Sequence, residues 1–239
     1  MAGIWAICKK EFWGYFNSLI AYFFTIIFLG AVNFLYVFMV LFPNGQLNLS
    51  TYFDILLMGM WFIIPAITMK SWAEEKKLGT DELLLTFPLK DWDVVLGKFL
   101  AGFLFFGLIL ALSFVVPLSA SLLGKSDWGV IICGYLGLLL VAGAFLAIGQ
   151  TMSSFTKSQA VAFVSSLLIC LLLLGLNNLA GLVALPKGLS SLINYLDVGW
   201  HFDSIARAVI DTRDIVFYLS LMAFFLVLNK YWLDRRKWA

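Results

Sequence analysis

Side chains that could carry out chemistry are few and widely separated in this chain. His201 is the only histidine, and no Ser, Cys or Asp stands near a second candidate base. The three cysteines, Cys8, Cys133 and Cys170, lack the short spacings of metal-ligand sets. We therefore predict no catalytic residue and no metal site, with the cysteines as small buried hydrophobic residues. His201 is interpreted as a surface or capping residue in an outward loop.

One short motif, Gly124-Lys125-Ser126, resembles the end of a phosphate-binding loop. The full motif needs a glycine five positions before its last glycine, and Ser119 stands there instead. We therefore predict that the chain has no ATPase activity of its own and no cofactor. Any nucleotide chemistry would belong to another chain.

The composition limits the kind of element that could position these residues. Of the 239 residues, 62% are hydrophobic and 13% are charged, and the mean hydropathy is +0.97, whereas soluble domains are about 25% charged. The apolar runs are unbroken over about 20 residues, which favours membrane-spanning helices over the short alternating strands of a barrel. The net charge of +2 gives no support for nucleic-acid binding. We predict an all-α integral membrane protein.

Six spans are predicted from these runs: residues 19–42, 51–69, 94–118, 128–152, 160–182 and 215–231. Lys and Arg are unevenly distributed between the connections, with twelve of the 16 on the side that holds both termini. Because the more positive side of a membrane protein faces the cytoplasm, both termini are predicted to be cytoplasmic. The sequence shows no linker or second domain, so residues 1–239 are expected to form a single domain.

Residues 3–17 precede the first span and are predicted to form an amphipathic elbow helix along the membrane surface. Lys10 lies on its polar face and Phe12 on its apolar face. Glu11 also falls within the apolar arc. Two interpretations stay open, because Glu11 could reach the surface or pair with a nearby lysine, or it could bond a neighbouring element inside the membrane boundary.

The predicted spans contain few polar groups. Asp54, near the outer end of the second span, is the only ionisable side chain that we place within them, which argues against a proton- or sodium-driven carrier. In the fourth span, Gly143, Ala147 and Thr151 follow a spacing of small residues that permits close helix contact. This spacing does not distinguish a contact within the chain from a contact between two chains.

The longest charged interval, residues 70–98, connects the second and third spans, and residues 70–94 of it are predicted to be the cytoplasmic coupling region. Its first part is expected to extend the helix of the second span as far as Gly79, which breaks it. Thr80 is a suitable N-cap for a short second helix that stops at Pro88. That helix carries two acidic residues and then three leucines: Asp81, Glu82, Leu83, Leu84 and Leu85. Such leucines need cover from a partner surface or from the membrane interface, and a plain charged hairpin is the alternative.

The outward segment, residues 183–213, is predicted to hold a short amphipathic helix. Its apolar face consists of Val198, Phe202, Ile205 and Val209. Its opposite face carries an i, i+4 ladder of Asp203, Arg207 and Asp211. A structural lid is one interpretation of this segment, and contact with a periplasmic partner or with cargo is the other.

The run AEEKKLGTDELLLTFPLKDWDVVLGKFLA at residues 73–101 resembles the cytoplasmic loop of ABC-2-type transporter permeases. Residues 9–23 resemble the elbow of the gliding-motility-associated permease branch (GldF), and residues 201–220 resemble its outer segment and last span. NosY, a permease of copper-site maturation, is a relative of this branch. Two positions depart from the branch: Leu19 stands where Pro is often found, and Ala208 replaces a frequent Gly, which is expected to make the outer helix more regular.

The resemblance implies a permease subunit that works with a dimer of a cytoplasmic ABC ATPase, which would hold ATP and Mg, and with a second permease. The second permease would be a different chain with a large periplasmic domain, or a second copy of this chain. By matching positions, residues 80–88 would dock in an ATPase groove as a coupling helix. Four charged residues would frame that contact: Glu74, Glu75, Lys76 and Lys77.

The function implied by this resemblance is ATP-driven export across the bacterial inner membrane. Two alternatives stay open. The chain could be a mechanical transmitter or scaffold that acts on the periplasm without moving cargo. A stand-alone channel or carrier is the weaker alternative.

Overall fold

The computed structural model describes residues 2–44, 48–80, 90–123, 127–182, 193–209 and 211–236, which are helical almost throughout. Within these ranges, six helical stretches are long and apolar enough to cross a membrane. They are Leu19–Leu41, Leu49–Leu78, Asp91–Leu122, Trp128–Phe155, Gln159–Asn177 and Thr212–Arg235. The prediction of an all-α protein with six spans is confirmed.

The helices in chain order are α1 (Ala2–Phe16), α2 (Leu19–Tyr36), α3 (Phe42–Asn44), α4 (Leu49–Thr68), α5 (Lys70–Leu78), α7 (Asp91–Ser113), α8 (Val115–Leu123), α9 (Trp128–Phe155), α10 (Gln159–Leu182), α12 (Val198–Ala206) and α13 (Thr212–Arg236). A π-helical segment, η1 (Val37–Leu41), joins α2 to α3. Several helices extend beyond the predicted spans, and α13 continues past the last span into the charged residues after Tyr231.

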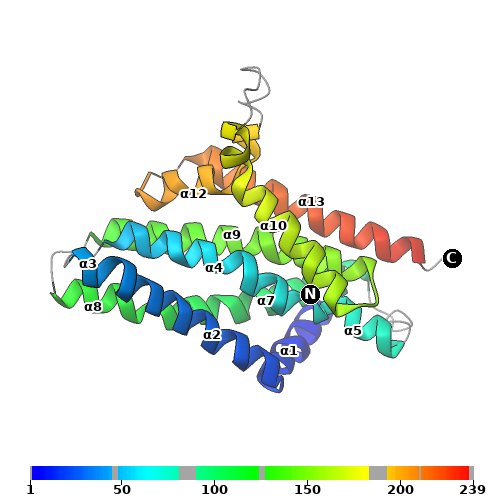
Figure 1. Ribbon diagram of the computed structural model, residues 1–239. Coiled ribbons are helices and arrows are strands. Elements are labelled where there is room, and N and C mark those ends of the chain that lie inside the picture. The colour runs from blue at the N-terminus through cyan, green and yellow to red at the C-terminus, as the bar shows by residue number, and fades with distance from the viewer. Residues whose placement is uncertain are drawn as a thin grey trace.

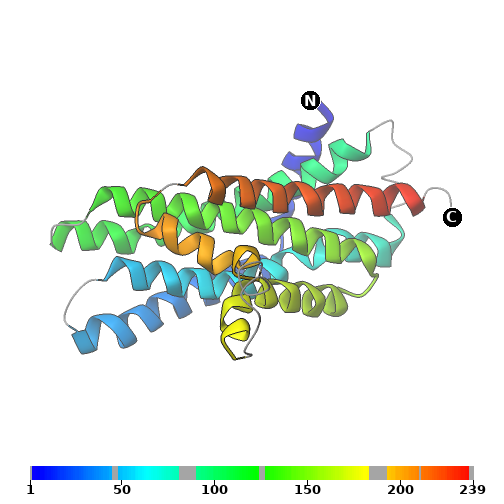
Figure 2. The ribbon, with the colours of Figure 1, turned by 90° about the horizontal axis from the view of Figure 1, so that it is seen from above.

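Helix α9 forms the centre of the bundle. It packs against α4, α5, α7, α10, α12 and α13, and 72% of its most apolar stretch is buried, compared with 17% for α10. Figures 1 and 2 show the long helices running beside one another, with α12 lying over the bundle next to α13. Helix α1 is inclined to this bundle and packs along α7 (Figure 1).

Small residues allow α13 to approach α9 closely. A Cβ atom placed on Gly143 would lie 2.5 Å from Cε of Met222 in α13. Further along α9, the hydroxyl of Thr151 lies 2.8 Å from the carbonyl oxygen of Phe225. The spacing of Gly143, Ala147 and Thr151 therefore serves a contact within the chain.

The third span changes from α7 to α8 near Pro117. Proline has no backbone N–H, so the carbonyl oxygen of Ser113, four residues earlier, lacks its usual helical partner. The hydroxyl of Tyr52 in α4 donates to this carbonyl at 2.9 Å. The second and third spans are thereby joined near their outer ends.

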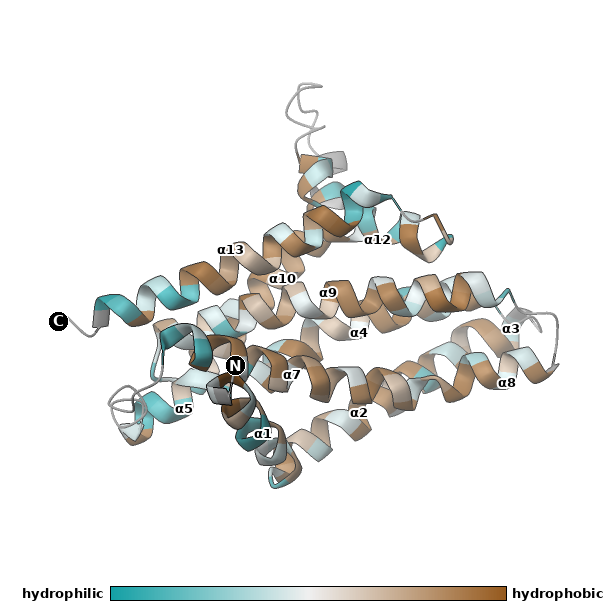
Figure 3. Cartoon of the chain, turned by 180° about the vertical axis from the view of Figure 1, so that it is seen from behind, coloured by the Kyte–Doolittle hydropathy of each residue, from teal (hydrophilic) through white to brown (hydrophobic). Residues whose placement is uncertain are grey.

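Hydrophilic residues lie at two places on the bundle. Figure 3 shows them on α1, on α5 and on the C-terminal end of α13, and again on α12 beside the start of α13. The long helices between these places are mostly hydrophobic (Figure 3). We call the end with α1 and α5 the inner end and the end with α12 the outer end, following the predicted distribution of Lys and Arg.

Helix α12 is shorter than the sequence predicted. Ala208 adopts a left-handed conformation with φ of 62°, so the helix ends at Ala206. Val209 lies beyond this end and is 60% exposed, so it does not share the apolar face. The expectation that alanine at position 208 makes the outer helix more regular is wrong.

Of the two i, i+4 charge pairs predicted along this helix, only the first is formed. Asp203 and Arg207 approach each other to 3.8 Å. Asp211 lies after the helix, and its side chain accepts from the backbone N–H of Arg213 at 2.9 Å. The i, i+4 spacing fails at Asp211 because the left-handed turn has already ended the helix.

Candidate functional site

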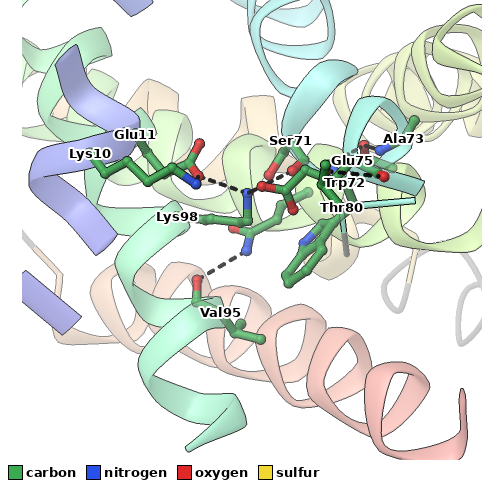
Figure 4. Close-up of polar contacts among 11 residues, drawn as sticks. Lys10, Glu11, Ser71, Trp72, Ala73, Glu75, Thr80, Val95 and Lys98 are labelled. Atoms are coloured by element: carbon green, nitrogen blue, oxygen red, sulfur yellow. Dashed lines mark hydrogen bonds and ion pairs between the residues drawn. The ribbon is translucent and has the colours of Figure 1, made fainter. Parts of the chain in front are cut away.

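A buried lysine joins three helices at the inner end. Lys98 lies near the start of α7 and is 4% exposed. Its Nζ donates to Oε1 of Glu11 in α1 at 3.0 Å, to Oε1 of Glu75 in α5 at 2.8 Å and to the carbonyl oxygen of Ser71 at 2.9 Å (Figure 4). It also lies 4.9 Å from the ring centroid of Trp72. An ammonium group has three donors, and all three are used. We call these five residues the inner polar cluster.

Close packing of α1 on α7 places Glu11 in this cluster. A Cβ atom on Gly97 would lie 2.8 Å from Cβ of Ile7, so glycine is needed for this approach. Tyr15 stacks on Phe105 of α7 at 4.7 Å between ring centroids. Burial, and to a smaller extent the negative charge of Glu11, raises the pKa of the Tyr15 hydroxyl. Glu11 therefore bonds a neighbouring helix, and because its partner is a lysine, this contact agrees with both interpretations that the sequence left open.

The first turn of helix α5 is hydrogen-bonded to α9. The first N–H groups of a helix lack intrahelical partners. The hydroxyl oxygen of Ser153 in α9 accepts from the N–H groups of Trp72 and Ala73, each at 3.0 Å, and it lies 3.0 Å from the carbonyl oxygen of Met69, to which it donates. Lys76 donates from Nζ to the carbonyl oxygen of Ser154. The break between α4 and α5 is therefore held by α9.

Helix α7 is fastened to α9 in a similar way. The side-chain amide of Gln150 donates to the carbonyl oxygen of Val95 at 3.0 Å. Helices α5 and α7 are the elements on either side of residues 81–89, and Lys98 connects them directly (Figure 4). Helices α5 and α7 are thus joined to each other, to α1 and to α9.

The predicted frame of charged residues divides into two groups. Glu75 is in the inner polar cluster, and Lys76 is buried against α9. Glu74 is partly exposed and lies 4.0 Å from Lys70, while Lys77 is exposed. Only the second group, Glu74 and Lys77, lies on the surface of the inner end. The role of all four residues in docking an ATPase stays a prediction.

The end of α5 agrees with the sequence. Gly79 is left-handed with φ of 70° and ends the helix, as predicted. Thr80 is exposed, and its hydroxyl donates back to the carbonyl oxygen of Glu75 at 3.4 Å. The remaining predicted coupling residues lie outside the described residues: Asp81, Glu82, Leu83, Leu84, Leu85 and Pro88.

Lys98 corrects the prediction that Asp54 is the only ionisable side chain in a span. It lies inside the third apolar stretch, Asp91–Leu122, and not at the end of a solvated loop. Sequence analysis counted it with the charged interval. Two signals could have identified it: its place within an apolar helix, and the unusual position of Glu11 in the apolar arc of the elbow helix. In that helix, Lys10 is exposed, and Phe12 packs on Phe16 at 5.2 Å between ring centroids.

A second polar group lies at the outer end. His201 is fully buried, with Nδ1 2.7 Å from Oδ1 of Asp214 and Nε2 2.9 Å from the carbonyl oxygen of Tyr195. Asp214 also accepts from the hydroxyl of Ser204. The imidazole stacks on Phe217 at 4.0 Å between ring centroids. We call these five residues the outer polar cluster. The interpretation of His201 as a surface residue is wrong, because α12 lies flat on α9 and α13.

Other contacts hold α12 to its neighbours. Asp197 caps the helix by accepting from the N–H of Trp200 at 3.0 Å, and it also accepts from the N–H of Asn177 in α10 at 2.7 Å. Phe202 is also buried, and its ring packs against α9 at Gly137. The other predicted outer residues, Asp203, Arg207 and Asp211, are exposed. The structure thus separates the predicted outer site into a buried pair and an exposed charged surface.

The described residues contain no group of three or more His, Cys, Asp or Glu side chains placed to hold a metal ion. Cys8 and Cys170 are buried, and Cys133 is partly exposed. The polar chemistry of the described part of the chain is therefore that of hydrogen bonds and ion pairs between helices.

Comparison with protein families matches residues 5–233 to the ABC-2 family transporter protein. No curated protein matches the chain. The matched range includes all the membrane-spanning stretches except the end of α13, and it includes both polar clusters. The chain belongs to the ABC-2 family of transporter membrane proteins.

Proposed function

We propose that this chain couples ATP hydrolysis by a separate cytoplasmic ATPase dimer to export across the bacterial inner membrane. Membership of the ABC-2 family makes it a multi-pass permease subunit, and that family works with an ABC ATPase. Three parts of this function go beyond family membership: the outward direction of transport, the inner membrane as the location, and the entry of force through residues 81–89. The second permease, on the resemblance to the GldF branch, is a different chain with a large periplasmic domain.

The inner polar cluster is the observation that carries this proposal. Lys98 joins α5 and α7, which flank residues 81–89, and it joins both to α1. A rigid joint at this place would pass a movement of residues 81–89 to three helices at once. Through Ser153 and Gln150 the same movement would reach α9, the central helix.

The surface next to this joint suits a protein partner. Leu78, the last residue of α5, is 68% exposed, and Lys77 and Thr80 beside it are exposed as well. Protein interfaces have an apolar centre and a polar rim, and Leu78 would contribute to such a centre. This surface is followed in the sequence by Leu83, Leu84 and Leu85, the three leucines expected to be covered by a partner.

Replacement of Leu84 by Asp tests the docking. The chain would be co-expressed with a candidate ABC ATPase, and co-purification and ATP hydrolysis would be measured. Leu122→Asp, the same change at an 82% exposed leucine near the outer end, is the matched control. Leu84→Asp is expected to abolish co-purification and stimulated hydrolysis, while Leu122→Asp retains both. If Leu84→Asp behaves as the wild type does, the coupling proposal fails.

A mechanical transmitter is the second candidate function. Most buried residues of α4, α7 and α9 are apolar, and buried polar ones such as Gln150 and Ser153 are used in hydrogen bonds between helices, which leaves little polar lining for a hydrophilic cargo in the described part of the bundle. The complex would be reconstituted in vesicles and assayed for movement of lipid, peptide or polysaccharide. ATP turnover without any cargo movement would favour the transmitter and contradict export.

A further inference from the structure

A groove of about 850 Å³ lies between α1 and the junction of α4 and α5. Part of its lining is apolar and comes from the start of α2 and the ends of α4 and α5: Leu19, Ile20, Ile67 and Leu78. The rest is charged and comes from α1 and α5: Lys10, Glu11, Lys70, Glu74 and Glu75. Figure 4 shows Lys10 and Glu11 approaching the α5 residues from the side of α1. The groove thus lies where a membrane span meets a charged surface.

The charged lining presents both signs. Oε1 of Glu75 is bound to Lys98, but Oε2 is buried and has no hydrogen-bond partner among the described residues. A buried carboxylate oxygen without a hydrogen-bond donor is unfavourable, so a ligand that donates to this atom would be stabilised. Lys10 and Lys70 contact carboxylates only at 4.0 Å, which leaves their ammonium groups available to an anion.

The exposed apolar residues identify the kind of ligand. Leu19, in the first turn of the first span, is 85% exposed, and Ile20 beside it is 40% exposed. An occupant that covers them needs an apolar part on the membrane side and a compact group of both charges on the other side. A phospholipid has this form, and it can enter the groove from the bilayer.

We propose that this groove binds the headgroup of a membrane phospholipid that carries both a phosphate and a primary ammonium, as in phosphatidylethanolamine. The phosphate pairs with Lys10 and Lys70, and the ammonium donates to Glu74 and to the free Oε2 of Glu75. An acyl chain covers Leu19. A choline headgroup has no N–H to donate, and a glycerol headgroup has no cation. The lipid would touch α1 and α5 at once and hold them in this arrangement. This proposal does not depend on export or on an ATPase.

Native mass spectrometry of the delipidated full chain tests the preference. Phosphatidylethanolamine, phosphatidylcholine and phosphatidylglycerol with identical acyl chains would be titrated separately. Loss of a charge-assisted hydrogen bond corresponds to about a tenfold loss of affinity, so phosphatidylethanolamine is expected to bind about tenfold more tightly than phosphatidylcholine. Equal binding of the two, or tighter binding of phosphatidylglycerol, would overturn the proposal.

Two glycine variants locate the site. Gly14 lines the groove, and Gly30 lies on α2, and a Cβ atom at either position would meet nothing within 4 Å. Gly14→Leu is expected to remove the preference for phosphatidylethanolamine by filling the groove, whereas Gly30→Leu retains it. If Gly14→Leu does not fold, Glu74→Gln serves in its place, since Glu74 is 43% exposed. An unchanged lipid preference in the folded groove variant would place the binding elsewhere and contradict the proposal.

Discussion

In both the inner and the outer polar cluster, a buried basic side chain contacts a carboxylate group. The two clusters connect different parts of the chain. At the inner end, Lys98 binds Glu11, 87 residues away, and Glu75, 23 residues away. At the outer end, the partners of His201 are only 6 and 13 residues away. The inner cluster joins separate helices, and the outer cluster fixes a local turn of the chain onto the bundle.

The two clusters also differ in how completely they are closed. The inner cluster holds two carboxylates around one ammonium and borders the groove beside α1. In the outer cluster, both oxygens of Asp214 are occupied and the side chain is almost fully buried. The outer end is thus built as a fixed cover, while the inner end is a joint between elements that a partner could move together.

Replacement of Lys98 by Met should have the largest effect. It leaves Glu11 and Glu75 facing each other without their cation, and removing one partner of a buried ion pair costs about 3–5 kcal/mol. Denaturant unfolding in mixed micelles, followed by circular dichroism, measures the free energy of unfolding. Lys70→Met is the matched control, because its partly exposed pair with Glu74 contributes only about 0–1 kcal/mol. Similar losses in the two variants would contradict the central place given to Lys98.

Replacement of His201 by Phe should have a smaller effect at the outer end. The aromatic ring can still stack on Phe217, but Oδ1 of Asp214 and the carbonyl oxygen of Tyr195 lose the imidazole nitrogens that face them. A buried acceptor left without a partner costs about 1–3 kcal/mol, and Ser204 still donates to Asp214. The same unfolding measurement applies, with limited proteolysis of residues 193–209 as a second readout. Asp203→Asn, on the exposed face of α12, should leave both unchanged; a loss as large as that of Lys98→Met would remove the contrast between the clusters.

The six spans could be predicted because long apolar runs alone determine them. The end of α5 at Gly79 was also predictable, because glycine readily adopts the left-handed conformation that ends a helix. Ala208 carries no such signal, since alanine seldom adopts this conformation. The ends of the outer helix and of its charge ladder were therefore missed.

Buried polar contacts between distant segments could be predicted only in part. Glu11 showed its unusual position because the helix period is a local property of residues 3–17. Its partner Lys98 could not be chosen from the sequence, because the choice depends on how α1 packs on α7 at Gly97. His201 was misplaced for a related reason: a polar stretch between two spans gives no sign that one of its helices lies flat on the bundle.

Replacement of Gly149 by Ala tests the scaffold on which the inner cluster depends. A Cβ atom at this position would clash with the hydroxyl and Cβ of Thr68 in α4, next to the junction with α5. Overpacking of this kind costs about 1–3 kcal/mol, because rotation of the Thr68 side chain can move its hydroxyl but leaves its Cβ in place. Gly175→Ala in α10, where a Cβ atom meets nothing within 4 Å, should instead stabilise the helix by about 0.5–1 kcal/mol. If both changes have the same sign in unfolding measurements, α4 and α9 are not as close as described.

Replacement of Ala208 by Gly should give the smallest change, and it should be a gain. A left-handed alanine costs about 1–2 kcal/mol, while glycine adds about 0.5–1 kcal/mol of entropy to the unfolded chain, so the net stabilisation is about 0.5–1 kcal/mol. Ala206→Gly, the same change two residues earlier at the last residue of α12, should destabilise by about 0.5–1 kcal/mol. Thermal unfolding of both variants by circular dichroism checks the opposite signs. If Ala208→Gly is destabilising, the chain does not turn at residue 208, and α12 with its buried His201 would not be fixed to the bundle as a cover.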